Sequence, residues 1–264
     1  MLDIRGAVAV ITGGASGIGE AVAKYWVKRG GKVVLADVSP DGLARVESDI
    51  KQMQGEAAAL VCNVTREDDC AALAKLAIDR FGAINLVLPC AGIIKDGLFL
   101  SPDRETGKVN KKMALDQFQA VINLNLTGVF LTVRECAEQM INHRCKGLIC
   151  LISSTGSLGT AGQINYSSTK AAMSVMPKVI TAEFFRRNIA DMIRCVAIAP
   201  GYVGTAMVKG MNQKALDSII ENVPIGRLVE PEEVASLIIE LYRNEALAGD
   251  VYFIHGGLRI GSKG

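Results

Sequence analysis

Short apolar runs alternate with longer segments of helical periodicity along almost all of the 264 residues. The apolar runs lack a polar/apolar alternation, which is typical of strands covered on both faces. Strands separated by helices, joined by right-handed crossovers, form an open parallel sheet. We therefore predict one α/β domain over residues 1–264, a doubly wound parallel sheet of about seven strands with helices on both faces. The expected strands are Val8–Ile11, Lys32–Ala36, Ala58–Val61, Leu86–Leu88, Gly147–Ile152, Ile193–Ala199 and Val251–Ile254; the expected helices are Gly17–Arg29, Pro40–Gln54, Arg66–Phe81, Leu115–Asn142, Asn165–Arg187 and Pro231–Asn244.

Composition and charge narrow the possible function classes. Half of the residues are hydrophobic, but polar residues or glycines interrupt every apolar stretch well before the length of a membrane span. The first residues lack a basic region followed by an apolar stretch, so we expect a cytoplasmic protein without a signal peptide. The net charge is only +2 and basic residues do not cluster, which argues against nucleic acid as a partner.

Cysteine and histidine usage points away from disulfide and metal chemistry. The seven cysteines are odd in number and form no CxxC pair, so reduced, buried thiols are the simplest interpretation. The chain has only two histidines, His143 and His255, which argues against a histidine-rich metal site. Neither histidine lies in a segment typical of a catalytic loop, which disfavours a Ser/His/Asp hydrolase. We expect no metal.

A glycine-rich turn, Thr12–Gly19, directly follows the first strand and opens the first helix. Glycines let the backbone turn sharply and approach a pyrophosphate, and the helix start offers free N–H groups and a positive dipole end. The second strand is followed by Asp37, about 20 residues after the turn, where a carboxylate can accept hydrogen bonds from adenosine ribose hydroxyls. This arrangement predicts a dinucleotide site; the alternative for Asp37 is a helix cap.

With its TGxxxGxG spacing, the turn resembles that of the short-chain dehydrogenase/reductase family, which has a Rossmann-type fold. The resemblance runs from about Ala7 to Gly257. The other matching segments are Asn125-Leu126, Ser153 after a strand, Tyr166 to Lys170, and Pro200-Gly201 followed by Thr205.

The resemblance implies a catalytic set of Asn125, Ser153, Tyr166 and Lys170. Tyr166 and Lys170 are four residues apart and share a helix face, so the ammonium is expected to lower the pKa of the phenol and make it a usable acid/base. Two serines compete for the role of hydrogen-bonding the substrate oxygen. The glycine three residues after Ser153 favours it over Ser154. Asn125 is implied at a helix irregularity, where it holds a water; a solvent-facing amide is the alternative.

The same resemblance implies the cofactor contacts. Asp37 disfavours a 2′-phosphate, and Ser16 and Val38 are uncharged where NADP-preferring relatives carry a basic residue, so we expect NAD. The expected cofactor-binding residues are Gly13, Ser16, Gly17, Ile18, Gly19, Asp37, Val38, Asn63, Val64, Ala91, Gly92, Tyr166, Lys170, Pro200, Gly201, Val203 and Thr205.

Several segments depart from the family pattern. Cys90 stands where an asparagine usually ties neighbouring strands, and Asn63 where an aspartate often contacts adenine. Residues 95–113 form a longer insertion than expected, with a possible hairpin turning at Gly107, which we expect beside the mouth of the active site. Residues 202–228 are expected to form the substrate lid.

The expected activity is hydride transfer between NAD and a ketone or secondary alcohol, by a homotetramer. The pattern is most similar to 3-oxoacyl-[acyl-carrier-protein] reductases, and Arg144, Lys146, Arg186 and Arg187 are candidates to meet a phosphopantetheine or an acidic carrier, or are an unrelated surface cluster. A small secondary alcohol, a polyol or a hydroxysteroid is the alternative substrate. An epimerase or dehydratase, and a cofactor-binding regulator without turnover, are the alternative functions.

Overall fold

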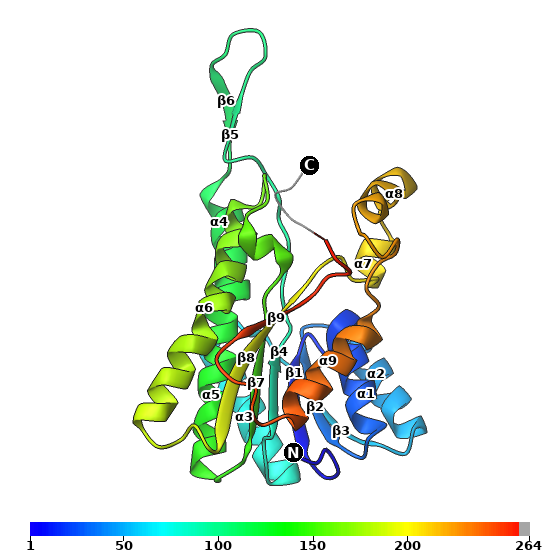
Figure 1. The fold of residues 1–264 in the computed structure, drawn as a ribbon, viewed down its shortest axis with the longest axis vertical. Coiled ribbons are helices and arrows are strands. Elements are labelled where there is room, and N and C mark those ends of the chain that lie inside the picture. Colours follow the sequence, from blue (N-terminus) through cyan, green and yellow to red (C-terminus); the bar gives the residue numbers. More distant parts are fainter. Residues whose placement is uncertain (259–264) are drawn as a thin grey trace.

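The computed structural model describes residues 1–258, and a seven-stranded parallel sheet in the order β3-β2-β1-β4-β7-β8-β9 forms its centre (Figure 1). The strands of this sheet are β1 (Val8–Thr12), β2 (Lys32–Asp37), β3 (Glu56–Val61), β4 (Leu86–Pro89), β7 (Gly147–Ile152), β8 (Ile193–Pro200) and β9 (Val251–Ile254). The longer helices are α1 (Gly17–Val27), α2 (Pro40–Gln52), α3 (Glu67–Phe81), α4 (Leu115–Ile122), α5 (Gly128–Asn142), α6 (Ile164–Arg186), α8 (Gln213–Glu221) and α9 (Pro231–Arg243).

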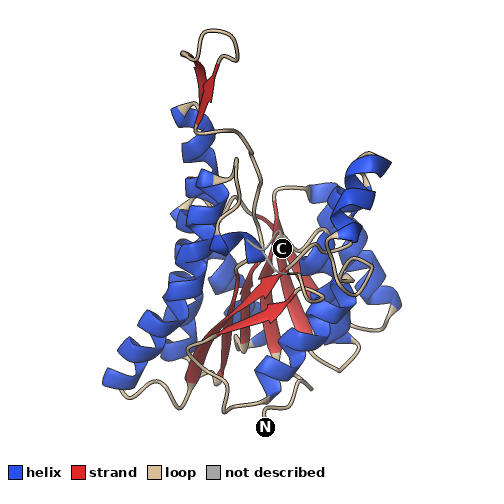
Figure 2. Cartoon of the chain, turned by 45° about the horizontal axis from the view of Figure 1, so that its top comes forward, coloured by secondary structure: helices blue, strands red, loops and turns tan. Residues whose placement is uncertain are grey.

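Helices cover both faces of the sheet and create two separate cores (Figure 2). Successive strand residues point to opposite faces. Val33 and Leu35 of β2 therefore pack with α1, α2 and α9, whereas Val34 and Ala36 pack in the core that contains residues of α3, α5 and α6. This double burial explains why the strands read as continuous apolar runs. The predicted fold class is confirmed; the last six residues of the expected domain lie outside the described part.

Two expected irregularities, one in a helix at Asn125 and a hairpin in the insertion, take a definite form in the structure. The single helix expected over Leu115–Asn142 is divided by a π-helical turn, Asn123–Thr127, between α4 and α5. The insertion forms a hairpin of β5 (Leu100–Pro102) and β6 (Val109–Lys112), whose turn includes Gly107 at φ 67°. The hairpin projects well beyond the body of the molecule (Figure 1).

The segment expected as a lid carries the short helix α7 (Ala206–Lys209) as well as α8. Every residue of α8 is at least partly exposed. Two hydrogen bonds close the base of this segment: Val229 N donates to the oxygen of Tyr202, and Gly204 N donates to the oxygen of Val229. The segment is thus tied at its base, and α8 lies above the sheet (Figure 1).

The strand order reverses between β1 and β4, which are adjacent and parallel in the sheet. In open α/β sheets the ligand crevice lies at such a point, outside the carboxyl ends of the strands. The glycine-rich turn follows β1 at this edge, and the segment of residues 90–93 follows β4. Among the helices of residues 1–258, none is long and apolar enough to cross a membrane.

Candidate active site

Close backbone contacts explain the glycines of the turn between β1 and α1. A Cβ atom at Gly13 would lie 2.8 Å from the nitrogen of Ala91, and one at Gly19 would lie 2.3 Å from the oxygen of Gly13. Gly13 and Gly17 also adopt φ values of 65° and 57°, which side-chain-bearing residues rarely adopt. In residues 1–258, the hydroxyl of Ser16 makes no capping hydrogen bond to the first turn of α1. The turn therefore leaves a cradle at a helix N-terminus, which fits a pyrophosphate.

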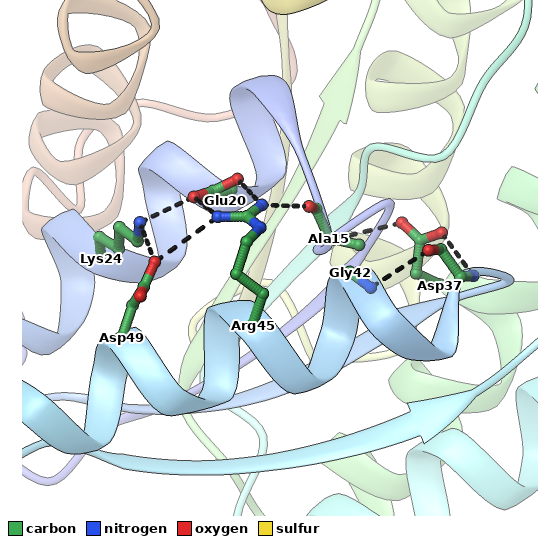
Figure 3. Close-up of polar contacts among 8 residues, drawn as sticks. Ala15, Glu20, Lys24, Asp37, Gly42, Arg45 and Asp49 are labelled. Carbon is green, nitrogen blue, oxygen red and sulfur yellow. Dashed lines mark hydrogen bonds and ion pairs between the residues drawn. The ribbon is translucent and has the colours of Figure 1, made fainter.

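Asp37 lies at the end of β2 and contacts this turn directly (Figure 3). Its Oδ2 accepts a hydrogen bond from Ala15 N at 3.2 Å, and its Oδ1 accepts one from Ser39 N at 3.1 Å. The cap of α2 is supplied by the hydroxyl of Ser39, which accepts a hydrogen bond from Gly42 N. The helix-cap alternative for Asp37 is thereby removed, and the carboxylate stands beside the turn and half-exposed. Val38, next to it, is 67% exposed.

The segment after β4 meets the turn from the other side. Ala91 N donates to the hydroxyl of Thr12 at 3.3 Å, and Cys90 N donates to the main-chain oxygen of Thr12 at 3.2 Å. An asparagine usually links the neighbouring strands at the position of Cys90. In this chain the two hydrogen bonds to Thr12 make that link instead. Burial raises the pKa of the Cys90 thiol to about 11, so at neutral pH it is a neutral thiol rather than a nucleophile.

Asn125 is fully buried in the π-helical turn and contacts the same segment. Its Oδ1 accepts a hydrogen bond from Ile93 N and its Nδ2 donates one to the oxygen of Ile93, both at 2.8 Å. Gly92 lies against this amide, because a Cβ atom there would be 3.4 Å from the Oδ1. A solvent-facing asparagine is excluded. The π-turn is a frequent feature of functional sites, and here it aims the amide at the end of β4.

Tyr166 and Lys170 lie one turn apart near the start of α6, as predicted. The Lys170 side chain is 7% exposed, and its Nζ lies 5.5 Å from the centre of the Tyr166 ring. The Nζ donates a hydrogen bond to the main-chain oxygen of Ile152 at 2.7 Å. Burial lowers the pKa of Lys170 to about 8, so the ammonium is the main form at neutral pH but a weakly held one.

The two serines after β7 have different surroundings. These surroundings do not fit the prediction that Ser153 hydrogen-bonds the substrate oxygen. The hydroxyl of Ser153 is buried against α6, where it donates to the main-chain oxygen of Lys170 at 2.7 Å and lies 2.9 Å from the Oγ of Ser174. Ser154 is half-exposed and points the other way, as successive residues of extended chain do. Its Oγ and the Tyr166 Cε1 both lie 3.4 Å from where a Cβ atom of Gly156 would be. The structure thus brings Ser154, not Ser153, to Tyr166.

The pKa of Tyr166 corrects a second expectation. Burial raises this pKa above its usual value, and the nearby carboxylate of Asp96 raises it further. A hydrogen bond with Ser154 is the contact that lowers it. Lys170 is not among the groups that lower this pKa, and its ammonium donates to the main-chain oxygen of Ile152. Tyr166 is therefore held as a neutral phenol, which is the proton-donating form.

The loop after β8 closes over the turn. The Cγ2 of Thr205 would lie 3.3 Å from a Cβ atom at Gly17, and the N–H of Thr205 donates to the oxygen of Val203 at 2.7 Å. Gly201 approaches the end of β9, because a Cβ atom there would be 2.9 Å from the Cβ of His255. Pro200 is the last residue of β8. The predicted loop residues are thus placed at the crevice.

Two of the predicted cofactor-binding residues, Asn63 and Val64, make contacts within the protein. The Oδ1 of Asn63 accepts hydrogen bonds from the N–H and the hydroxyl of Thr65, at 3.1 and 2.8 Å. Val64 is buried against Gly128 at the start of α5. Both residues follow β3, which is the edge strand of the sheet and pairs with β2. Asn63 is exposed there, whereas Val64 serves mainly the core.

Gln163 and Asn165, which lie just before Tyr166, were not predicted as site residues. Both hold the stem of the insertion, at Lys95 and Asp96. Asn165 is fully buried and donates to the main-chain oxygen of Lys95 at 2.8 Å, and Gln163 donates to the carboxylate of Asp96 at 3.0 Å. The stem thus lies beside Tyr166 although the hairpin projects away. A polar residue next to the predicted tyrosine was the only available signal.

A model of the family described as short chain dehydrogenase matches residues 7–216. The chain belongs to the short-chain dehydrogenase family. Its oxidoreductase class, acting on CH–OH groups, follows from that membership.

Several members of the family are similar to this chain over nearly its full length. The 3-oxoacyl-[acyl-carrier-protein] reductase of Thermotoga maritima is 32% identical over 98% of this chain and all of its own, and that of Synechocystis is 33% identical over 98% and 99%. A solved 7α-hydroxysteroid dehydrogenase, complexed with NADH and 7-oxo glycochenodeoxycholic acid, is 26% identical with a TM-score of 0.86, over 97% of this chain and 95% of that one.

Proposed function

We propose that this chain transfers a hydride between NAD(H) and a ketone or secondary alcohol, with 3-oxoacyl thioesters as the first substrate class. The observation that carries the proposal is the meeting of Tyr166, Ser154 and Lys170 at the carboxyl ends of the strands, beside a glycine cradle that fits a dinucleotide. The similarity to 3-oxoacyl-[acyl-carrier-protein] reductases supports the substrate class.

The chemistry divides between the cofactor and the chain. The nicotinamide, when bound, supplies or accepts the hydride at the substrate carbon. Tyr166, a neutral phenol at neutral pH, donates a proton to the carbonyl oxygen in the reduction. Ser154 hydrogen-bonds the same oxygen and stabilises the charge that develops there. Lys170, whose Nζ lies 5.5 Å from the centre of the Tyr166 ring, provides a cation near the phenolate that this proton transfer leaves. Asn125 fixes the segment after β4 that borders the crevice.

The cofactor proposal rests on charge. Asp37 places a half-exposed carboxylate next to Ala15 of the turn, and its neighbour Val38 is apolar and exposed. A 2′-phosphate would meet this carboxylate as a like charge. From that repulsion we expect kcat/KM with NAD(H) to exceed that with NADP(H) by roughly 10- to 1,000-fold.

A hydroxysteroid is the second candidate substrate, because a 7α-hydroxysteroid dehydrogenase has nearly the same fold as this chain. Exposed apolar residues in the loop after β8 and in the segment expected as a lid suit a bulky apolar substrate as well as an acyl chain. Tyr202, in the loop after β8, is 41% exposed, and Met211 in the segment expected as a lid is 44% exposed. The two substrate classes differ in the thioester, which a short pantetheine analogue can report.

We also propose a homotetramer. The outer faces of α4, α5 and α6 expose large apolar side chains, which monomeric proteins rarely leave uncovered in quantity. Leu115 is 77%, Val175 57% and Phe185 74% exposed. Two-fold packing of these helices would bury them. Light scattering at micromolar concentration tests this assembly, and a monomer there would contradict it.

One assay tests the activity. A panel of a 3-oxoacyl pantetheine thioester, a 7-oxo steroid and simple secondary alcohols would be followed by NADH absorbance, with Tyr166→Phe as the blank. Turnover of the thioester with NADH supports the proposal, and turnover of the steroid alone moves it to the second candidate. Better activity with NADPH would overturn the cofactor proposal. Cofactor binding without any turnover would favour a regulator.

A further inference from the structure

Arg45 contacts the glycine-rich turn on the side opposite to Asp37. Its Nη2 donates to the main-chain oxygen of Ala15 at 2.9 Å, whereas the N–H of the same residue donates to Asp37 (Figure 3). Arg45 comes from α2, and the packing of α2 on the turn is tight, because a Cβ atom at Gly42 would lie 2.9 Å from the Cβ of Ala15. A guanidinium and a carboxylate therefore flank one residue of the predicted phosphate-binding turn.

Glu20 of α1 holds this guanidinium in place. The Nη1 of Arg45 donates to the Oε1 of Glu20 at 2.8 Å and its Nη2 donates to the Oε2 at 2.6 Å, a bidentate pair. Glu20 is only 18% exposed, against 51% for Arg45, so the carboxylate is the fixed partner. The hydrogen bond with Arg45 lowers the pKa of Glu20, which is thus charged at neutral pH.

The surrounding charges cancel. The Nζ of Lys24 lies 2.7 Å from the Oε1 of Glu20 and 2.7 Å from the Oδ2 of Asp49. The Nη1 of Arg45 lies 3.5 Å from the same Oδ2 of Asp49. Two cations and two carboxylates thus form a closed network between α1 and α2. Asp37 stands outside this network beside the turn, and within residues 1–258 its carboxylate accepts hydrogen bonds from the N–H groups of Ala15 and Ser39 but makes no ion pair.

We propose that Glu20 is a specificity-determining residue for the cofactor, because it keeps the Arg45 guanidinium bound to α1 and unavailable to a 2′-phosphate. This inference rests on the proposed function. Arginine is the residue best suited to bind a phosphate in two-pronged fashion. Its presence beside the turn would by itself favour NADP(H). Neutralised by Glu20, it leaves the choice to Asp37, which favours NAD(H).

The test removes one charge from the network. Glu20→Gln keeps the side-chain shape but releases the guanidinium from its bidentate carboxylate. Glu47→Gln is the matched control, since Glu47 lies on α2, pairs with Lys51 at 3.6 Å and loses the same charge. Calorimetry would compare binding of 5′-AMP with that of adenosine 2′,5′-bisphosphate, and of NAD⁺ with NADP⁺.

We expect Glu20→Gln to shift the affinity ratio toward the 2′-phosphorylated ligand of each pair by about tenfold or more, and Glu47→Gln by less than about twofold. Adding Arg45→Met to Glu20→Gln should abolish the gain. Equal shifts in Glu20→Gln and Glu47→Gln, or a gain that survives Arg45→Met, would overturn the inference. If Glu20→Gln does not fold, Asp49→Asn removes the other carboxylate facing Arg45 and should give a smaller shift in the same direction; no shift would overturn it.

The outcome is separable from that of the proposed function. Wild-type protein that binds neither NAD⁺ nor 5′-AMP contradicts the dinucleotide site itself. Wild-type protein that binds NAD⁺ well, with a preference that Glu20→Gln leaves unchanged, contradicts only the role of Glu20.

Discussion

The Nζ of Lys170 donates a hydrogen bond to the main-chain oxygen of Ile152, the last residue of β7, at 2.7 Å. The bond fixes the start of α6 on the edge of the sheet where the cofactor crevice lies. It also keeps a cation in an almost fully buried position, which costs folding free energy. The site is therefore expected to be held at the expense of stability, a relationship that can be measured.

Replacing Lys170 with methionine should show that cost as a function of pH. The pKa of Lys170 falls from 10.5 to about 8 on folding, so between these values the unfolded chain binds more protons and wild-type stability rises with pH. The burial penalty is fully present below about pH 8 and disappears above about pH 10.5. The free energy of unfolding of Lys170→Met minus that of wild type should therefore decrease by about 2–3 kcal/mol when the pH is raised from 7 to 10. Urea titrations of both proteins at the two pH values measure this; parallel curves would contradict it. Activity should be lost in the variant at both.

Tyr166→Phe keeps the ring and removes the proton. General acid–base contributions are typically about 10²–10⁴-fold, so kcat should fall by at least about 100-fold while NADH affinity stays within about twofold. Stopped-flow or steady-state NADH absorbance gives the rate, and fluorescence titration gives the affinity. Near-normal turnover would remove Tyr166 from the mechanism.

The two serines make a matched pair. Ser154→Ala should lower kcat by about 10²-fold, as the loss of a donor to a developing oxyanion does, and leave the melting temperature almost unchanged. Ser153→Ala should lower the free energy of unfolding by about 1 kcal/mol, because it removes the buried donor to the oxygen of Lys170, with a smaller effect on kcat. Rates and thermal melts of both variants decide the assignment. The opposite pattern would restore Ser153 as the substrate-facing serine.

The hairpin can be removed without disturbing its stem. Met113 N donates to the oxygen of Phe99 at 3.1 Å, so an Asn-Gly turn can join these two residues in place of 100–112. The stem at Lys95 and Asp96 beside Tyr166 would remain. We expect the shortened protein to change the substrate KM more than the cofactor KM, because the insertion follows the carboxyl end of β4. Titrating substrate and NADH separately measures both constants; a change confined to the cofactor KM would place the insertion elsewhere in function.

The layered architecture and the spacing of the candidate site residues could be predicted from the sequence alone. The uninterrupted apolar runs require a sheet covered on both faces, and the spacing of Tyr166 and Lys170 requires a shared helix face. The glycines of the turn can be recognised in the sequence, because only glycine tolerates the close backbone approach that the structure shows at Gly13 and Gly19. These features are local, so the order of residues specifies them.

Tertiary structure decided what depends on contacts between distant segments. Which of Ser153 and Ser154 meets Tyr166 follows from the side of β7 on which each side chain lies when α6 packs there. The rise in the pKa of Tyr166 comes from burial, and the position of the Arg45 guanidinium from a carboxylate 25 residues earlier in the chain. Burial and long-range pairing arise only when the helices pack on the sheet, and spacing along the chain carries no record of them.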